Sequence, residues 1–227
     1  MGERSEERSP DGTTVVRKAV RSARLQVRPD GTVRVVAPPA FDVTGFLTRH
    51  EAWIAKRREE LDTLAAEGRG REDRLLLYGR FYSLAPGPRF AVDEAGGAVA
   101  YPSFPALRGR LARMLKEEAG ERLAALPDLA GEGPGRIAVK LQKTRWGSCS
   151  SLGNINLNLR VIALPRTLRE YVIVHEAAHL REQNHSGRFW HLVAGHYPGY
   201  RAAEAELRRY RVILERNRVW GALRDTG

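Results

Sequence analysis

The residues best suited to chemistry lie in segment 175–179, which reads His-Glu-Ala-Ala-His. In a helix with about 3.6 residues per turn, residues four apart share one face, so His175 and His179 can hold one metal ion between them. Glu176 lies about 100° further round such a helix. It can therefore reach a zinc-bound water without being a ligand. This spacing predicts a zinc hydrolase helix with Glu176 as the general base.

A third histidine, His185, follows six residues after His179. If the helix continued, residue 185 would lie about 15 Å along the axis from His175, too far to share a metal with ligand bonds of about 2 Å. The helix must therefore stop and the chain turn back. Asn184 suits the left-handed residue that often ends a helix, and Ser186 suits the N-cap of the next one. Three protein ligands and one open position are typical of a catalytic zinc site, with His175, His179 and His185 as ligands.

The alternative is a surface helix with solvated histidines. It has to explain the apolar residues around the motif, which indicate a buried helix: Val172, Ile173, Val174, Ala177, Ala178 and Leu180. Buried polar groups need partners, and a metal supplies one for each imidazole. We therefore favour the metal site. His191 and His196 lie beyond the turn, and we expect neither to be a ligand.

Several further segments extend the pattern. Residues 144–149 read Thr-Arg-Trp-Gly-Ser-Cys, 154–158 read Asn-Ile-Asn-Leu-Asn, and 184–190 contain Asn-His-Ser and Phe-Trp. Together with 171–180, they resemble the YgjP-like metallopeptidase family, metal-dependent hydrolases related to the SprT/Spartan zinc proteases. Ala177 departs from the family, which usually has a larger apolar residue there. The resemblance implies a zincin-like fold, the three histidines as zinc ligands and Glu176 as the catalytic residue.

A hydrolase also needs a group that stabilises the charge developing on the attacked oxygen. The candidates are Lys143, Arg145 and Tyr197. We favour Arg145, because it adjoins Trp146 in a segment that the family places near the site. A structural ion pair is an equally good explanation of Arg145.

Two regions of different character surround these residues, giving an α+β fold class. Residues 13–101 are expected to form a small, mostly β unit with one helix at 42–64. Its strands at 15–37 turn at Pro29-Asp30-Gly31, and two hairpins turn at Gly79-Arg80 and Gly96-Gly97. Residues 1–12 and 218–227 are expected to be flexible tails.

Residues 102–217 are expected to form the zincin-like catalytic domain. The apolar spacing predicts a long helix, two strands, the metal helix from about Pro165, and closing helices after Ser186 and Pro198. The long helix is expected at 104–126, and the strands at 137–141 and 155–159. In the second strand Asn154, Asn156 and Asn158 share one face, and we favour a structural role for them.

Composition places the protein in a broad class. The chain has 227 residues, 42% of them hydrophobic, and one cysteine, Cys149. It shows neither an apolar leader nor an apolar run of membrane-spanning length, so we expect a cytoplasmic protein. Cys149 is interpreted as a small buried residue rather than a ligand or nucleophile.

The net charge of +11 is concentrated in residues 101–227, where 21 basic and 12 acidic residues leave +9. This favours an anionic partner, although 33 of the 38 basic residues are Arg, which a compositional bias explains equally well. The favoured function is a zinc metallopeptidase, with its peptide substrate along an edge strand at 154–159. The alternatives are a metal-dependent phosphohydrolase acting on nucleotides and a DNA-associated protease, for which nucleic-acid binding would rest on charge alone. The oligomeric state stays open.

Overall fold

The computed structural model describes residues 5–9, 12–131, 133–142 and 144–225. They fall into two compact units. Unit 1 comprises Met1–Arg69 and Arg211–Arg216, and unit 2 comprises Gly70–Tyr210 and Asn217–Gly227. Both combine helices with short strands, so the chain has the expected α+β class. Among the described residues, no helix is both long and apolar enough to cross a bilayer.

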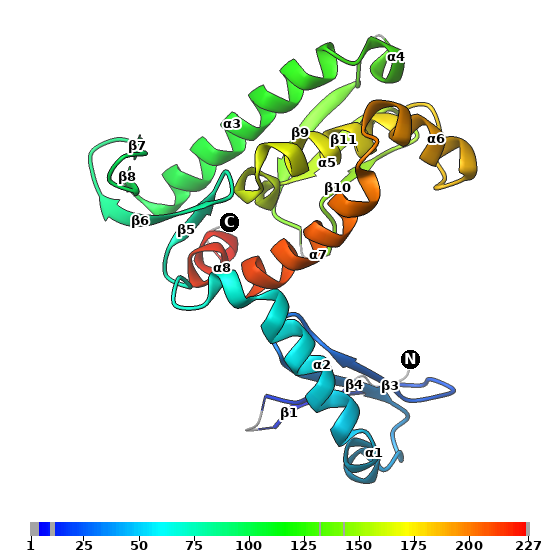
Figure 1. Cartoon of the computed structure of the whole chain (residues 1–227). Helices are drawn as coiled ribbons and strands as arrows, with labels where there is room; N and C mark the ends of the chain where they lie inside the picture. Colours follow the sequence, from blue (N-terminus) through cyan, green and yellow to red (C-terminus); the bar gives the residue numbers. More distant parts are fainter. Residues whose placement is uncertain (1–4, 10–11, 132, 143, 226–227) are drawn as a thin grey trace. The chain divides into compact units, whose positions relative to one another are not determined.

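Unit 1 is a four-stranded sheet packed on helices (Figure 1). The strand order is β1-β2-β4-β3, and β3 and β4 form the expected hairpin around Gly31. Alternate residues of β4 are buried, so one face of the sheet packs against α2. The elements are β1 (Ser5–Arg8), β2 (Thr14–Arg17), β3 (Arg24–Val27), β4 (Val33–Ala37), α1 (Val43–Arg49), α2 (Glu51–Leu64) and the 3-10 turn η1 (Ala66–Gly68).

Two expectations for unit 1 differ from the structure. The helix expected over 42–64 is two helices, because His50 ends α1 and begins α2. Its ring Nδ1 lies 2.8 Å from the carbonyl oxygen of Phe46. Within the expected flexible tail 1–12, Ser5–Arg8 pairs with β2 as an antiparallel strand.

The sheet formed by β5–β8 belongs to unit 2, so the units divide at Arg69 and not at residue 101. The strands are β5 (Leu75–Leu77), β6 (Arg80–Pro86), β7 (Ala91–Asp93) and β8 (Ala98–Tyr101), in the order β5-β6-β8-β7. The tip of the β5–β6 hairpin bonds to η2 (Leu159–Ala163), through Tyr78 N to Ile162 O at 3.0 Å and Gly79 N to Ala163 O at 2.8 Å. Hydrogen bonds between segments so distant in sequence hold this sheet to the unit that contains the metal helix.

The hairpin turn itself lies one residue earlier than expected. Tyr78 and Gly79 have φ values of 53° and 80°. Two consecutive positive φ values match the tight turn that joins right-twisted strands. Tyr78 is the only non-glycine residue with positive φ in the described part of the chain.

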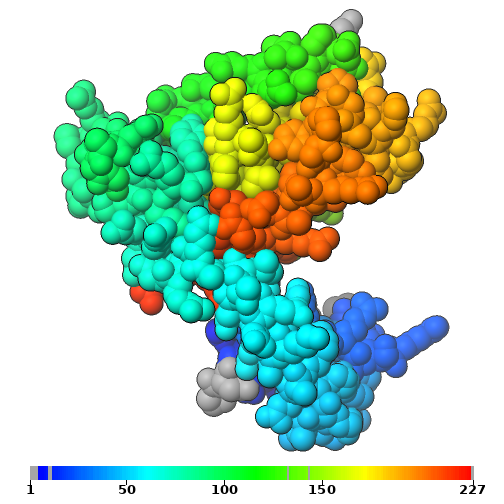
Figure 2. Space-filling model, in the orientation of Figure 1, coloured from blue at the N-terminus to red at the C-terminus, as the bar shows by residue number. Residues whose placement is uncertain are grey.

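The rest of unit 2 surrounds a three-stranded sheet of order β10-β11-β9 (Figure 1). The long helix α3 (Phe104–Ala124) buries a stripe of leucines and packs against β9, η2 and α5. In the space-filling view, the surface of α5, coloured yellow, lies between α3 and α7 (Figure 2). The other elements are α4 (Pro127–Ala130), β9 (Arg136–Lys140), β10 (Gly147–Cys149), β11 (Asn154–Asn158), α5 (Arg166–Ala178), α6 (Gly187–His196), α7 (Tyr200–Arg216) and α8 (Arg218–Asp225).

The prediction that the strand at 154–159 is an edge was wrong. This strand, β11, is central: it pairs antiparallel with β10 and parallel with β9. The additional strand β10 has three residues, Gly-Ser-Cys, and lacks an apolar alternation that would reveal it. The sheet edge near the metal helix is therefore β10, which packs against α5.

The expected flexible tail from residue 218 was also wrong, since Arg218–Asp225 forms α8. Val219, Trp220 and Leu223 are buried. The Trp220 ring donates from Nε1 to the Leu76 carbonyl at 3.1 Å, and Asn217 Oδ1 accepts from Trp220 N at 3.0 Å. An apolar helix face and a side-chain cap thus hold the chain's end in unit 2.

Candidate metal centre

Helix α5 carries the first two histidines and Glu176. Its buried residues cover most of its circumference, as the run of apolar residues predicts. The helix ends at Ala178 with His179 as its C-cap, earlier than the expected stop near Asn184. Asn184 is not in the left-handed region, so that part of the prediction was wrong. Ser186 does cap α6: its Oγ accepts from Phe189 N at 3.3 Å.

The turn after α5 brings the third histidine back to the first two. His175, His179 and His185 each offer a ring nitrogen, and these atoms lie within 4.8 Å of one another. Nε2 of His185 is 3.1 Å from Nε2 of His175. Three imidazole nitrogens that converge in this way fit a single metal ion.

In two of the rings, Nδ1 is the nitrogen that has a hydrogen-bond partner on the side away from the cluster. His179 Nδ1 lies 3.1 Å from the carbonyl oxygen of Glu182. A carbonyl only accepts, so Nδ1 carries the hydrogen and Nε2 is left for a metal. His175 Nδ1 lies 3.4 Å from the Tyr171 hydroxyl, so Nε2 is the nitrogen on the metal side. A hydroxyl can donate or accept, so this contact by itself does not fix the tautomer of His175.

His175 and His179 are in the form that binds metal. Burial, followed by the nearby His179 and His185, lowers the pKa of His175 to about 3. Burial also lowers the pKa of His179. Both rings are therefore neutral near pH 7, and neutral imidazole is the ligand form.

Aromatic side chains of α6 hold the three rings in place. Phe189, which is fully buried, stacks on His179 with ring centroids 4.4 Å apart. The ring of Trp190 lies 5.7 Å from that of His185 and stacks on Tyr200 at 5.1 Å. These contacts restrict ring rotation around the site.

Glu176 is buried beside the histidines, with 5% of its surface exposed. Its Oε2 has no hydrogen-bond partner among the described residues. Burial raises the pKa of Glu176 to about 8, opposed by the charge of Arg145. A buried carboxyl oxygen without a partner is costly in a scaffold, and it is a free proton acceptor or donor in an active site.

Comparison with known proteins agrees with this geometry. The model of the YgjP-like metallopeptidase domain matches residues 21–210. This chain belongs to the YgjP-like family. It is a metal-dependent peptidase of zincin-like fold. Among solved structures, the metallopeptidase zymogen of Pyrococcus abyssi abylysin is 30% identical, over 40% of this chain and 90% of that one, with a TM-score of 0.35. No curated protein matches the sequence.

Gly147 is a site residue of this YgjP-like domain that sequence reasoning missed. A Cβ at this position would lie 2.5 Å from Glu176 Oε1 and 2.7 Å from its Cδ. The backbone of β10 can therefore pass beside the glutamate only with glycine at this point. The sequence signal for it is the Trp-Gly-Ser-Cys segment at 146–149.

Arg145 and Asn158 have different roles in this region. The Arg145 side chain is exposed, and its charge acts on Glu176. Asn158 is buried, and its Nδ2 donates to the carbonyl oxygens of Arg145 at 2.6 Å and Gln142 at 2.9 Å. This bonding is what a structural role for Asn158 requires, and it fixes the loop that carries Arg145.

The remaining candidates lie around the site. Lys143 is outside the described residues. Tyr197 packs against Tyr171 with ring centroids 5.4 Å apart. His191 and His196 are not in the histidine cluster. Cys149 is half-buried in β10, and burial followed by the charge of Glu176 raises the pKa of its thiol.

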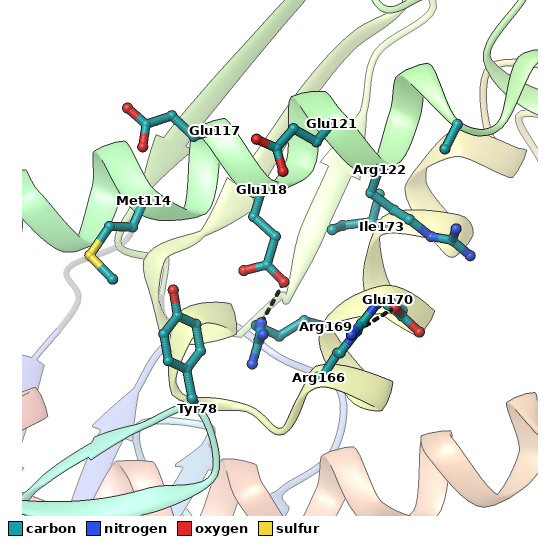
Figure 3. Close-up of a pocket in the computed structure, with 11 residues that line it drawn as sticks. Tyr78, Met114, Glu117, Glu118, Glu121, Arg122, Arg166, Arg169, Glu170 and Ile173 are labelled. Atoms are coloured by element: carbon teal, nitrogen blue, oxygen red, sulfur yellow. Dashed lines mark hydrogen bonds and ion pairs between the residues drawn. The ribbon is translucent and has the colours of Figure 1, made fainter. Parts of the chain in front are cut away.

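The opposite face of α5 is held by charged residues that line a pocket beside α3 (Figure 3). Arg169 Nε bonds to Glu118 Oε1 at 2.7 Å, and its Nη1 donates to the Leu164 carbonyl at 2.6 Å. Its guanidinium also lies 4.2 Å from the ring centre of Tyr78. Arg169 thus joins α3, the start of α5 and the hairpin tip, and these contacts hold α5 on the face opposite the metal centre.

Proposed function

We propose that this chain is a zinc peptidase in which His175, His179 and His185 hold the metal and Glu176 transfers the proton. One observation carries the proposal: three ring nitrogens converge at the helix that also carries Glu176, whose buried Oε2 has no hydrogen-bond partner in the described part of the chain. Three imidazoles with no carboxylate ligand suit zinc better than magnesium or calcium. Bound there, zinc would lower the pKa of a water molecule and polarise a carbonyl oxygen.

Glu176 has the position and the environment for general acid–base work. Its free Oε2 can accept a proton from the attacking water and then donate it to the departing amine nitrogen. Gly147 and the burial of the side chain keep this carboxyl in one place and away from bulk water. Arg145, exposed and acting electrostatically on Glu176, is the group we propose to stabilise the developing oxyanion.

The substrate that fits this arrangement is an extended peptide. In the described sheet, β10 pairs only with β11, so its other side offers backbone groups to an added strand. Because Gly147 of β10 adjoins Glu176, a peptide on this edge would pass beside the carboxyl. We therefore place the scissile bond next to β10 rather than next to β11.

A side-by-side assay tests the substrate class. Purified full-length protein loaded with zinc is offered unfolded casein in one arm and a panel of nucleoside triphosphates in the other. We expect new peptide termini in the first arm and no phosphate or pyrophosphate release in the second. Release of phosphate or pyrophosphate without peptide cleavage would replace the peptidase proposal with a phosphohydrolase.

A further inference from the structure

We propose that Tyr171 and Glu204 form a positioning pair that holds His175 in its metal-binding tautomer. The inference rests on the proposed metal site and adds two residues to it. Neither residue is placed in contact with a substrate. Their action is on the ring of His175, through its Nδ1 atom.

Tyr171 lies one helical turn before His175 on the same face of α5. It is 2% exposed, and its hydroxyl is 3.4 Å from His175 Nδ1. The two ring centroids are 5.9 Å apart, nearly perpendicular at 74°. The opposite nitrogen of His175, Nε2, faces Nε2 of His185 at 3.1 Å. The hydroxyl therefore contacts the side of the ring that points away from the metal site.

Glu204 of α7 determines where the single phenolic hydrogen goes. The Glu204 side chain is the acceptor that α7 offers to the Tyr171 hydroxyl. A carboxylate only accepts, so the hydroxyl donates to Glu204 and its oxygen is left to accept from His175 Nδ1–H. Because His175 then has its hydrogen on Nδ1, its Nε2 has no hydrogen and is free to bind metal.

Without Glu204 the direction of the hydrogen bond between Tyr171 and His175 is not determined. The Tyr171 hydroxyl would be free to donate to Nδ1 instead, and the hydrogen of His175 would then be on Nε2. That tautomer cannot bind a metal through Nε2. His179 has no such dependence, because its Nδ1 faces the backbone carbonyl of Glu182, which no side-chain substitution removes.

Four variants test whether Tyr171 and Glu204 act through the His175 tautomer or through packing and charge. Tyr171→Phe keeps the ring and removes the hydroxyl. Glu204→Ala removes the acceptor, whereas Glu204→Gln restores an acceptor oxygen without the charge. Tyr210→Phe, a change in another buried tyrosine, on α7, is the matched control for losing a buried hydroxyl.

The measurement is Zn²⁺ affinity of the full-length protein, by competition with a chromophoric chelator. We expect Tyr171→Phe and Glu204→Ala each to weaken binding by about 10–100-fold, the usual effect of removing an outer partner of a ligand. Glu204→Gln and Tyr210→Phe should stay within about threefold of wild type, and the double variant Tyr171→Phe/Glu204→Ala should be no weaker than Tyr171→Phe alone. Nitrogen-15 NMR of the metal-free protein should show Nδ1–H on His175 in wild type and a mixture of tautomers in Glu204→Ala.

Three results would overturn the inference. The first is wild-type affinity in Tyr171→Phe, and the second is an unchanged His175 tautomer in Glu204→Ala. The third is a Glu204→Gln protein as weak as Glu204→Ala, since that would make Glu204 a ligand or a charge acting directly. The proposed function fails separately: in that case wild type binds no zinc, or His175→Ala binds it unchanged.

Discussion

Glu176 depends on a neighbour that has no side chain. We predict that Gly147→Ala displaces the Glu176 carboxyl, because the new Cβ would lie 2.5 Å from Oε1. A displacement on the order of 1 Å in a catalytic group costs up to about 100-fold in rate. The variant should therefore lose about 10–100-fold in peptidase kcat while it keeps one zinc per chain. Gly195→Ala in α6, where a Cβ meets nothing within 4 Å, is the control. Equal kcat values for Gly147→Ala and the control would refute the close-approach argument.

The raised pKa of Glu176 also predicts a stability effect in the metal-free protein. Between the ordinary pKa of 4.5 and about 8, the unfolded chain releases this proton while the folded chain keeps it. Protonated Glu176 therefore contributes its full stabilisation of the folded state at a pH below 4.5, and this stabilisation is lost as the pH rises through 8. Gln at position 176 does not titrate. The free energy of unfolding of Glu176→Gln minus that of wild type should therefore increase by roughly 2–4 kcal/mol from pH 5 to pH 9.

Urea unfolding of both proteins in a chelator, at pH 5 and pH 9, measures this difference. The lowered pKa of His175 acts in the opposite direction, below pH 6.5, and is present in both proteins, so it cancels. A stability difference that does not change with pH would show that Glu176 titrates normally in the fold.

At the scale of elements, two ion pairs on the back of α5 give a matched comparison. The Arg169 and Glu118 side chains are 9% and 25% exposed, whereas Arg166 is 83% exposed in its pair with Glu170. Arg169→Ala leaves a partly buried carboxylate unpaired and should destabilise the protein by about 3 kcal/mol. Arg166→Ala should cost less than about 1 kcal/mol. Chemical denaturation measures both, and equal losses would mean that Arg169 does not hold α5 in place.

Sequence periodicity predicted the elements that have strong, local signals. The long helix expected at 104–126 is α3, and the cap at Ser186 begins α6. The missed strand β10 and missed helix α8 are short, and long-range contacts stabilise them: pairing with β11 in one case, and burial of Trp220 in the other. The strand β10 has no apolar alternation, and the apolar spacing of Val219, Trp220 and Leu223 covers only about two turns, too few to predict a helix.

The site was predictable where helix geometry alone decides. The spacing of His175 and His179 required one face of one helix, with Glu176 about 100° further round, and distance then required a turn before His185. Gly147 and Glu204 come from other elements, β10 and α7, and their relation to the motif depends on tertiary packing. A single sequence cannot show that relation.

For the whole molecule, metal binding should be linked to folding, because the three histidines are brought together only in the folded state. Zinc at a free concentration about 1,000 times its Kd should stabilise the protein by about 4 kcal/mol. Thermal unfolding with zinc and with a chelator measures the shift in Tm. His185→Ala should remove most of it, and His191→Ala should retain it in full. A shift that survives His185→Ala would place the stabilising metal elsewhere.

The central claim is that Glu176, beside a metal held by three histidines, activates water to cleave peptides. The most direct test is casein cleavage by wild type and Glu176→Gln, with zinc per chain measured on the same samples. We predict one zinc in each protein, with turnover reduced by at least about 100-fold in Glu176→Gln, since the amide cannot take the proton. Undiminished cleavage by a fully loaded Glu176→Gln protein would contradict the account.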